Sequence, residues 1–200
     1  MIKELNNFLL FVFILTLATG SSLFLINVGS FSLFAFRVAV FVIPVILVFN
    51  KSFYRPGKNI ISDLFLIILL LFLISAVISY FWVPNQVYAA KAIIYWLTVI
   101  LMTFSLLSFA RYSENFLKIF TYAWISGFAI NIVISIYEIT TGSHLVSEYS
   151  LQLYSYHPGH FIHFSPASLF GNPNHFAIYL VHSVIIFLLL RKYIPTGVLS

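Results

Sequence analysis

The sequence predicts an all-α polytopic membrane protein, and three observations carry this prediction. Of the 200 residues, 62% are hydrophobic and only 8% are charged, whereas soluble domains carry about 25% charged residues. The apolar residues form long runs near the ~20 residues that cross a bilayer, too long and too apolar for soluble strands. The basic residues gather in alternate connections between these runs. Together these features exclude a water-soluble fold, and they indicate that the lipid bilayer is a partner.

Six apolar runs are predicted to cross the membrane as helices. Their approximate bounds are 8–27, 31–49, 62–81, 92–109, 116–137 and 173–190. The first run is too long for a secretory signal and lacks a small-residue cleavage site, so we expect it to be retained. Gly20 and Pro44 lie within the first two spans, where neighbouring helices are expected to tolerate them. No repeat or linker interrupts residues 1–200, so a single membrane domain is predicted.

The distribution of basic residues predicts the orientation. With the N-terminus inside, the cytoplasmic connections hold eight of the ten Lys and Arg residues: Lys3, Lys51, Arg55, Lys58, Arg111, Lys118, Arg191 and Lys192. Of the other two, Lys91 begins the fourth span on the outer side and Arg37 lies inside the second. Because cytoplasmic loops carry the excess of Lys and Arg, both termini are predicted to lie in the cytoplasm.

The outer side then receives a tight turn at 28–30, a short connection near 82–86 and one long loop from about 139 to 171. A loop of this length is uncommon without a function or disorder to explain it. Its histidines include His157, His160 and His163, and imidazole is a common zinc or copper ligand. Pro158 and Gly159 would interrupt a helix that aligned them, so interfacial histidines are favoured over a metal site, and we expect no bound metal.

The end of this loop carries a clear helix-start signal, Gly171-Asn172-Pro173-Asn174-His175. Asn172 is a favourable N-cap residue, Pro173 suits the first helical position, and Gly171 lets the chain turn tightly before the cap. Asn174 and His175 would then lie in the first turn, at the positive end of the helix dipole, where anions bind. The structural interpretation, a helix start and nothing more, is the alternative.

Three ionisable residues lie in or beside the predicted spans. Arg37, about 9 Å below the outer boundary at 1.5 Å per residue, either reaches the outer headgroups or faces the bundle interior to hold a phosphate or carboxylate. Glu138, at the outer end of the fifth span, is expected to be solvated, with a catalytic role as the alternative, and Gly142 suits the turn after that helix. His182 shares a helix face with His175 and is expected to face protein or a wet cavity.

The segment Gly171-Asn172-Pro173-Asn174-His175-Phe176-Ala177, followed by an apolar span, resembles the Asn-Pro-Asn signature of the O-antigen ligase and polymerase family. The setting agrees, with an outer loop before the motif, Glu138 near the end of the preceding helix and Arg37 in the second span. The resemblance implies a GT-C-like membrane glycosyltransferase of the bacterial cytoplasmic membrane. Such an enzyme ligates or polymerises surface polysaccharide carried on a polyprenyl diphosphate. Arg37, Asn172, Asn174 and His175 would bind substrate, while Gly171 and Pro173 would shape the turn.

Length is where the chain departs from that family, whose members have about twice as many residues and a catalytic outer loop in their second half. The resemblance therefore implies an N-terminal half, with a C-terminal half or polysaccharide-assembly proteins as partners and no catalytic residue assigned here. No nucleotide-binding loop, acidic metal motif or Cys is present, so neither a cofactor nor a nucleic acid is expected. A non-enzymatic transporter or an accessory membrane subunit is the alternative. The sugar, the acceptor and the choice between ligation and polymerisation stay open.

Overall fold

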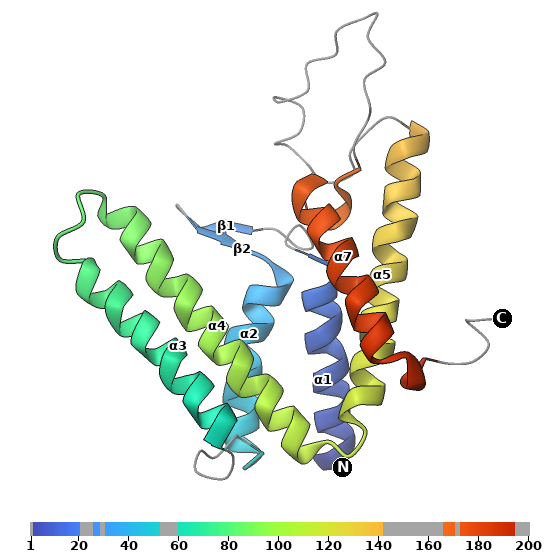
Figure 1. The fold of residues 1–200 in the computed structure, drawn as a ribbon, viewed down its shortest axis with the longest axis horizontal. Coiled ribbons are helices and arrows are strands. Elements are labelled where there is room, and N and C mark those ends of the chain that lie inside the picture. The colour runs from blue at the N-terminus through green and yellow to red at the C-terminus, as the bar shows by residue number, and fades with distance from the viewer. Residues whose placement is uncertain are drawn as a thin grey trace, which may run out of the picture. The chain divides into compact units, whose positions relative to one another are not determined.

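A computed structural model describes residues 2–20, 26–28, 31–52, 60–141, 166–170 and 173–194, and most of them are helical (Figure 1). The helices and strands are α1 (Ile2–Ala18), β1 (Ile26–Val28), β2 (Phe31–Leu33), α2 (Ala35–Phe49), α3 (Ile60–Ser79), α4 (Gln86–Tyr112), α5 (Phe116–Thr141) and α7 (Pro173–Leu189), with the short 3-10 turns η1 (Ser168–Phe170) and η2 (Arg191–Tyr193). By length and composition, α3, α4 and α5 can each cross a membrane.

The chain divides into two compact units, and each is described by itself. Unit 1 comprises 1–6 and 39–114 and contains most of α2 with α3 and α4. Unit 2 comprises 7–38 and 115–200 and contains most of α1, the strands, α5, η1, α7 and η2. The prediction of a single membrane domain stays a prediction.

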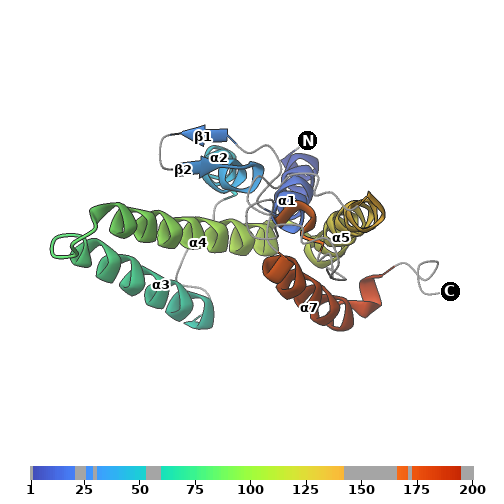
Figure 2. The same ribbon diagram turned by 90° about the horizontal axis from the view of Figure 1, so that it is seen from above.

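In unit 1, α3 and α4 form an antiparallel hairpin and lie side by side in both views (Figures 1 and 2). The connection ends at Asn85, whose side chain accepts hydrogen bonds from the backbone N–H groups of Val87 and Tyr88. Because this cap satisfies first-turn donors, α4 begins at Gln86, six residues before the predicted start of the fourth span. Midway along the hairpin, the rings of Phe72 and Trp96 stack with centroids 4.7 Å apart.

In unit 2, α5 packs against both α7 and the η1 turn. The helix α5 runs to Thr141, four residues past the predicted end of the fifth span, and α7 begins at Pro173 as predicted. Gly127 of α5 lies against the end of α1 so closely that an added Cβ would be 2.5 Å from the Cβ of Ala18. Only a residue without a side chain allows this approach.

The first two predicted spans have the wrong boundaries. Instead of continuing to residue 27, α1 ends at Ala18, because Gly20 adopts a left-handed backbone with φ of +81°, the conformation that commonly ends helices. The prediction that Gly20 is tolerated inside a helix is therefore wrong. Residues 26–28 and 31–33 pair as an antiparallel hairpin, with Ile26 opposite Leu33, and α2 starts only at Ala35. Pro44 does lie within α2.

Candidate functional site

A buried carboxylate holds the turn that precedes α7. Glu138, in the last turns of α5, is fully buried. Its Oε2 accepts hydrogen bonds from the backbone N–H groups of Ala167, at 2.9 Å, and Ser168, at 2.8 Å. The prediction that Glu138 is solvated is therefore wrong, because its partners arrive from a turn about thirty residues further along the chain.

The same turn is held a second time by Asn131. The Ser168 hydroxyl donates to Oδ1 of Asn131 at 2.7 Å, with the backbone oxygen of Asn131 3.0 Å away. Ser168 has a positive φ of 50°, a conformation that costs a non-glycine residue energy and persists only where neighbours impose it. Here Glu138 accepts from the backbone N–H of Ser168 and Asn131 accepts from its hydroxyl, so the two residues together impose this conformation.

Asn131 also connects this turn to α1. Its Nδ2 donates to the backbone oxygens of Ala18 and Gly127, each at 2.8 Å, so a carbonyl in the last turn of α1 gains a side-chain donor. An added Cβ at Gly20 would lie 2.9 Å from the backbone oxygen of Leu169. The end of α1, the middle of α5 and η1 therefore meet at one polar centre, which we call the Glu138–Asn131 anchor (Asn131, Glu138, Ala167 and Ser168).

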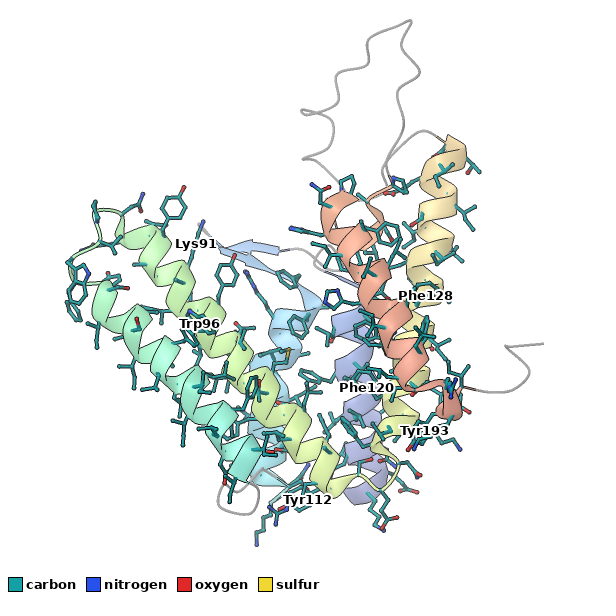
Figure 3. The ribbon with its side chains drawn as sticks, in the orientation of Figure 1. Lys91, Trp96, Tyr112, Phe120, Phe128 and Tyr193 are labelled. Atoms are coloured by element: carbon teal, nitrogen blue, oxygen red, sulfur yellow. The ribbon has the colours of Figure 1, made fainter. Side chains whose placement is uncertain are left out.

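An aromatic layer continues from the anchor along α7. Phe170 of η1 packs on Tyr179 with ring centroids 4.7 Å apart, and Tyr179 packs on Trp124 at 5.6 Å. The Trp124 Nε1 donates to Ser183 Oγ at 3.1 Å, in the interior of unit 2. Phe128, labelled in Figure 3, extends the layer with an edge-to-face contact to Phe187. The inward face of α7 is thereby fixed to α5 along several turns.

The predicted motif residues lie just beyond the anchor. Pro173 is half-buried at the start of α7, whereas Asn174 and His175 are exposed in its first turn. Gly171 and Asn172 lie outside the described residues, so the predicted N-cap stays a prediction. Phe176 is buried. The first turn of α7 therefore has an apolar side against the protein and a polar side, with Asn174 and His175, that a ligand can reach.

Arg37 occupies a different position from the predicted one. Since α2 begins at Ala35, Arg37 lies in its first turn rather than two turns inside a span. The side chain is half-buried and its guanidinium lies 4.6 Å from the centroid of the Phe34 ring, a cation–π arrangement. The expectation that Arg37 and Asn174 both bind substrate stays a prediction.

Of the histidines singled out in the sequence, the structure describes His175 and His182. His182 is exposed on α7 rather than facing the protein, and its Nδ1 pairs with the backbone oxygen of Ile178 at 2.8 Å. Within the described ranges, no three His, Cys, Asp or Glu side chains gather as metal ligands. His157, His160 and His163, with Gly142, fall in the range 142–165, which the structure does not describe.

Asn131 and Ser168 are the residues that sequence reasoning missed. One signal was available for Asn131: Gly127, Asn131, Ser135 and Glu138 recur at spacings of four, four and three along an apolar helix, which places them on one face. A stripe of small and polar residues on a membrane helix is typical of a packed interface. No comparable signal marks Ser168, which lies outside any periodic segment.

Comparisons with models of known protein families, with curated proteins and with solved structures found no match to this chain.

Chemically, the anchor is suited to positioning. The Glu138 side chain accepts hydrogen bonds from two backbone N–H groups, the Asn131 amide donates two, and the Ser168 hydroxyl donates to Asn131. Buried polar groups satisfied in this way specify one arrangement of the chain. The groups able to meet a ligand are the exposed ones that the anchor places, Asn174 and His175.

Proposed function

We propose that this chain functions as a membrane glycosyltransferase that ligates or polymerises polysaccharide carried on a polyprenyl diphosphate. One observation supports the proposal most strongly. The segment resembling the family signature begins a helix at Pro173, and the turn before it is fixed to α5 by a buried carboxylate. A generic helix start between two membrane spans needs no such anchor, whereas a substrate-side element must be held in position.

The chemistry of a diphosphate leaving group fits the polar groups at the start of α7. A diphosphate needs cations and N–H donors placed where its charge develops. The first turn of a helix offers free N–H groups and a positive dipole end, and Asn174 and His175 are exposed beside them. Arg37 would add bidentate phosphate contact. In this proposal these groups bind the lipid-linked donor, and the residue that activates the acceptor is not among them.

The proposed setting is the bacterial cytoplasmic membrane, with six spans and both termini inside. The charge distribution supports it, because eight of the ten Lys and Arg residues lie on the predicted cytoplasmic side. Besides α3, α4 and α5, the shorter apolar helices α2 and α7 would be spans. The start of α7 would then lie at the outer surface, where lipid-linked glycans are transferred to an acceptor.

Binding of undecaprenyl diphosphate to the chain in nanodiscs tests the proposal. Arg37→Gln and Asn174→Ala should each weaken binding, Arg37→Gln by roughly tenfold or more because a charged hydrogen bond is lost. Lys91→Gln is the matched control, since it removes a cation from the same predicted side and should leave the affinity within about twofold. Equal affinity in all four proteins would reject the proposal.

A further inference from the structure

The ends of α5 and α7 away from the anchor form an open apolar groove. It has a volume of about 250 Å³ and is lined by Phe116, Leu117, Phe120, Ile186, Leu189 and Leu190, with no polar side chain among them. Phe116, Leu117 and Phe120 come from the first turns of α5, and the other three from the last residues of α7 and the one after it. Because both helices end here, the groove opens at one rim of the predicted membrane layer.

Two cations follow the groove directly. Leu189 and Leu190 are succeeded by Arg191 and Lys192, both exposed in η2, and η2 contacts α5. Within the part of the chain that the structure describes, neither cation forms a salt bridge with a carboxylate. Lys192 Nζ lies 5.0 Å from the centroid of the Tyr193 ring. Figure 3 shows Phe120 and Tyr193 at this end of the helix pair.

We infer that this groove is a binding site for an anionic glycerophospholipid. Its layout matches that ligand in two respects: an apolar groove lies between the ends of two helices, and two exposed cations follow it directly in the chain. Basic pockets between membrane helices on the cytoplasmic side are typical sites for acidic headgroups. One acyl chain lies along Phe120 and Ile186, and the phosphate lies against Arg191 and Lys192. The site is distinct from the proposed donor site at the start of α7.

The chain contains a reporter for this site. Trp124 stacks on Phe120 with ring centroids 5.8 Å apart and an interplanar angle of 5°, so a lipid in the groove is separated from Trp124 by one ring. Only two other tryptophans are present, Trp82 and Trp96. Replacing both by Phe leaves Trp124 alone and retains an aromatic partner for Phe72.

The test uses the full chain with Trp82→Phe and Trp96→Phe in phosphatidylcholine vesicles. A fixed small fraction of the lipid is brominated phosphatidylglycerol or brominated phosphatidylcholine, and quenching of Trp124 is measured. We expect brominated phosphatidylglycerol to quench at several-fold lower mole fraction. Adding Arg191→Gln and Lys192→Gln should remove this preference. Each substitution should weaken the preference for phosphatidylglycerol on the order of fivefold. Ile186→Phe, which fills the groove and keeps both cations, should weaken quenching by both lipids.

The matched control carries Lys51→Gln and Arg111→Gln, which remove the same charge from the same predicted side at residues that do not line the groove. It should keep the phosphatidylglycerol preference. Equal quenching by the two lipids in the starting protein would overturn the inference. An equal loss of preference in the control pair would also overturn it, because it would show general attraction to an anionic surface. None of these outcomes depends on glycan transfer, so the proposed function stands or fails separately.

Discussion

The α3–α4 hairpin and the contacts around α5 are held together in different ways. The α3–α4 hairpin is held by apolar contact and the Phe72–Trp96 stack, and α3 leaves most of its large side chains exposed. The contact of α5 with the end of α1 and with η1 depends instead on a glycine at van der Waals distance and on buried Asn131 and Glu138. Lipid tails are as apolar as leucine, so apolar surface alone gives membrane helices little specificity. We infer that buried polar contacts specify how α1, α5 and η1 are arranged within unit 2, whereas the α3–α4 hairpin mainly presents a surface to lipid.

Removing the buried carboxylate should have the largest effect. Glu138→Ala leaves the N–H groups of Ala167 and Ser168 unpaired, at a cost of about 3 kcal/mol in the free energy of unfolding. Glu138→Gln keeps an oxygen acceptor and should cost about 1 kcal/mol. The loss is measured by denaturant titration of the Trp124 fluorescence in a chain that carries Trp82→Phe and Trp96→Phe. Gln86→Ala, an exposed change in the first turn of α4, is the control and should stay within about 0.5 kcal/mol. Equal stability of Glu138→Ala and the control would contradict the anchor.

Overpacking the α1–α5 contact should come next. Gly127→Ala places a Cβ 2.5 Å from that of Ala18 and should destabilise unit 2 by about 1–3 kcal/mol. Adding Ala18→Gly removes the clashing atom and should restore much of the loss, measured by the same titration as a double-mutant cycle. Independent, additive effects of the two substitutions would show that the helices do not meet at these residues.

The hairpin should respond more weakly and only locally. Trp96→Ala removes the stack on Phe72 and should cost about 1 kcal/mol, whereas Trp96→Phe should be close to neutral. Hydrogen exchange of backbone amides is the measurement: protection should fall in α3 and α4 while the amides of α5 and α7 keep theirs. A loss that spread through α5 would remove the contrast between the two helix pairs.

The smallest effect is expected at the exposed pair of Lys3 and Glu114. Lys3 Nζ lies 2.6 Å from Glu114 Oε1, and its hydrogen bond and charge lower the pKa of Glu114 from the ordinary value of 4.5. A lowered folded-state pKa gives stability that is present above 4.5 and lost as the pH falls through the folded value. Lys3→Gln should return the Glu114 pKa toward 4.5 in an NMR titration. An unchanged pKa would show that the pair does not persist in solution.

The sequence predicted those parts of the fold that depend on local signals. The start of α7 at Pro173 and the start of α5 at Phe116 follow from a helix-start pattern and from apolar runs. Elsewhere a local feature prevailed over hydropathy: Gly20 ends α1 inside the first predicted span, and Asn85 starts α4 early. Hydropathy measures transfer into lipid and carries no information on backbone conformation, so these boundaries were missed.

In the candidate site, too, only the features that depend on adjacent residues were predictable from the sequence. Asn174 and His175 were placed in a first helical turn from adjacent residues, and they lie there. The burial of Glu138 was not predictable from its neighbours, because its environment is supplied by Ala167 and Ser168, about thirty residues further along the chain. An acid at a helix end is solvated or buried according to which distant segment returns to it. Periodicity reports only which face of its own helix it occupies.

Hydrogen exchange of two backbone amides tests the central claim most directly. If Glu138 holds the turn before α7, the N–H groups of Ala167 and Ser168 should exchange slowly in the folded protein. They should lose that protection in Glu138→Ala, while the amides of the α3–α4 hairpin stay unchanged. If these two amides exchange as fast as those of an unstructured peptide in the unsubstituted protein, Glu138 does not anchor the turn and the account of the site is wrong.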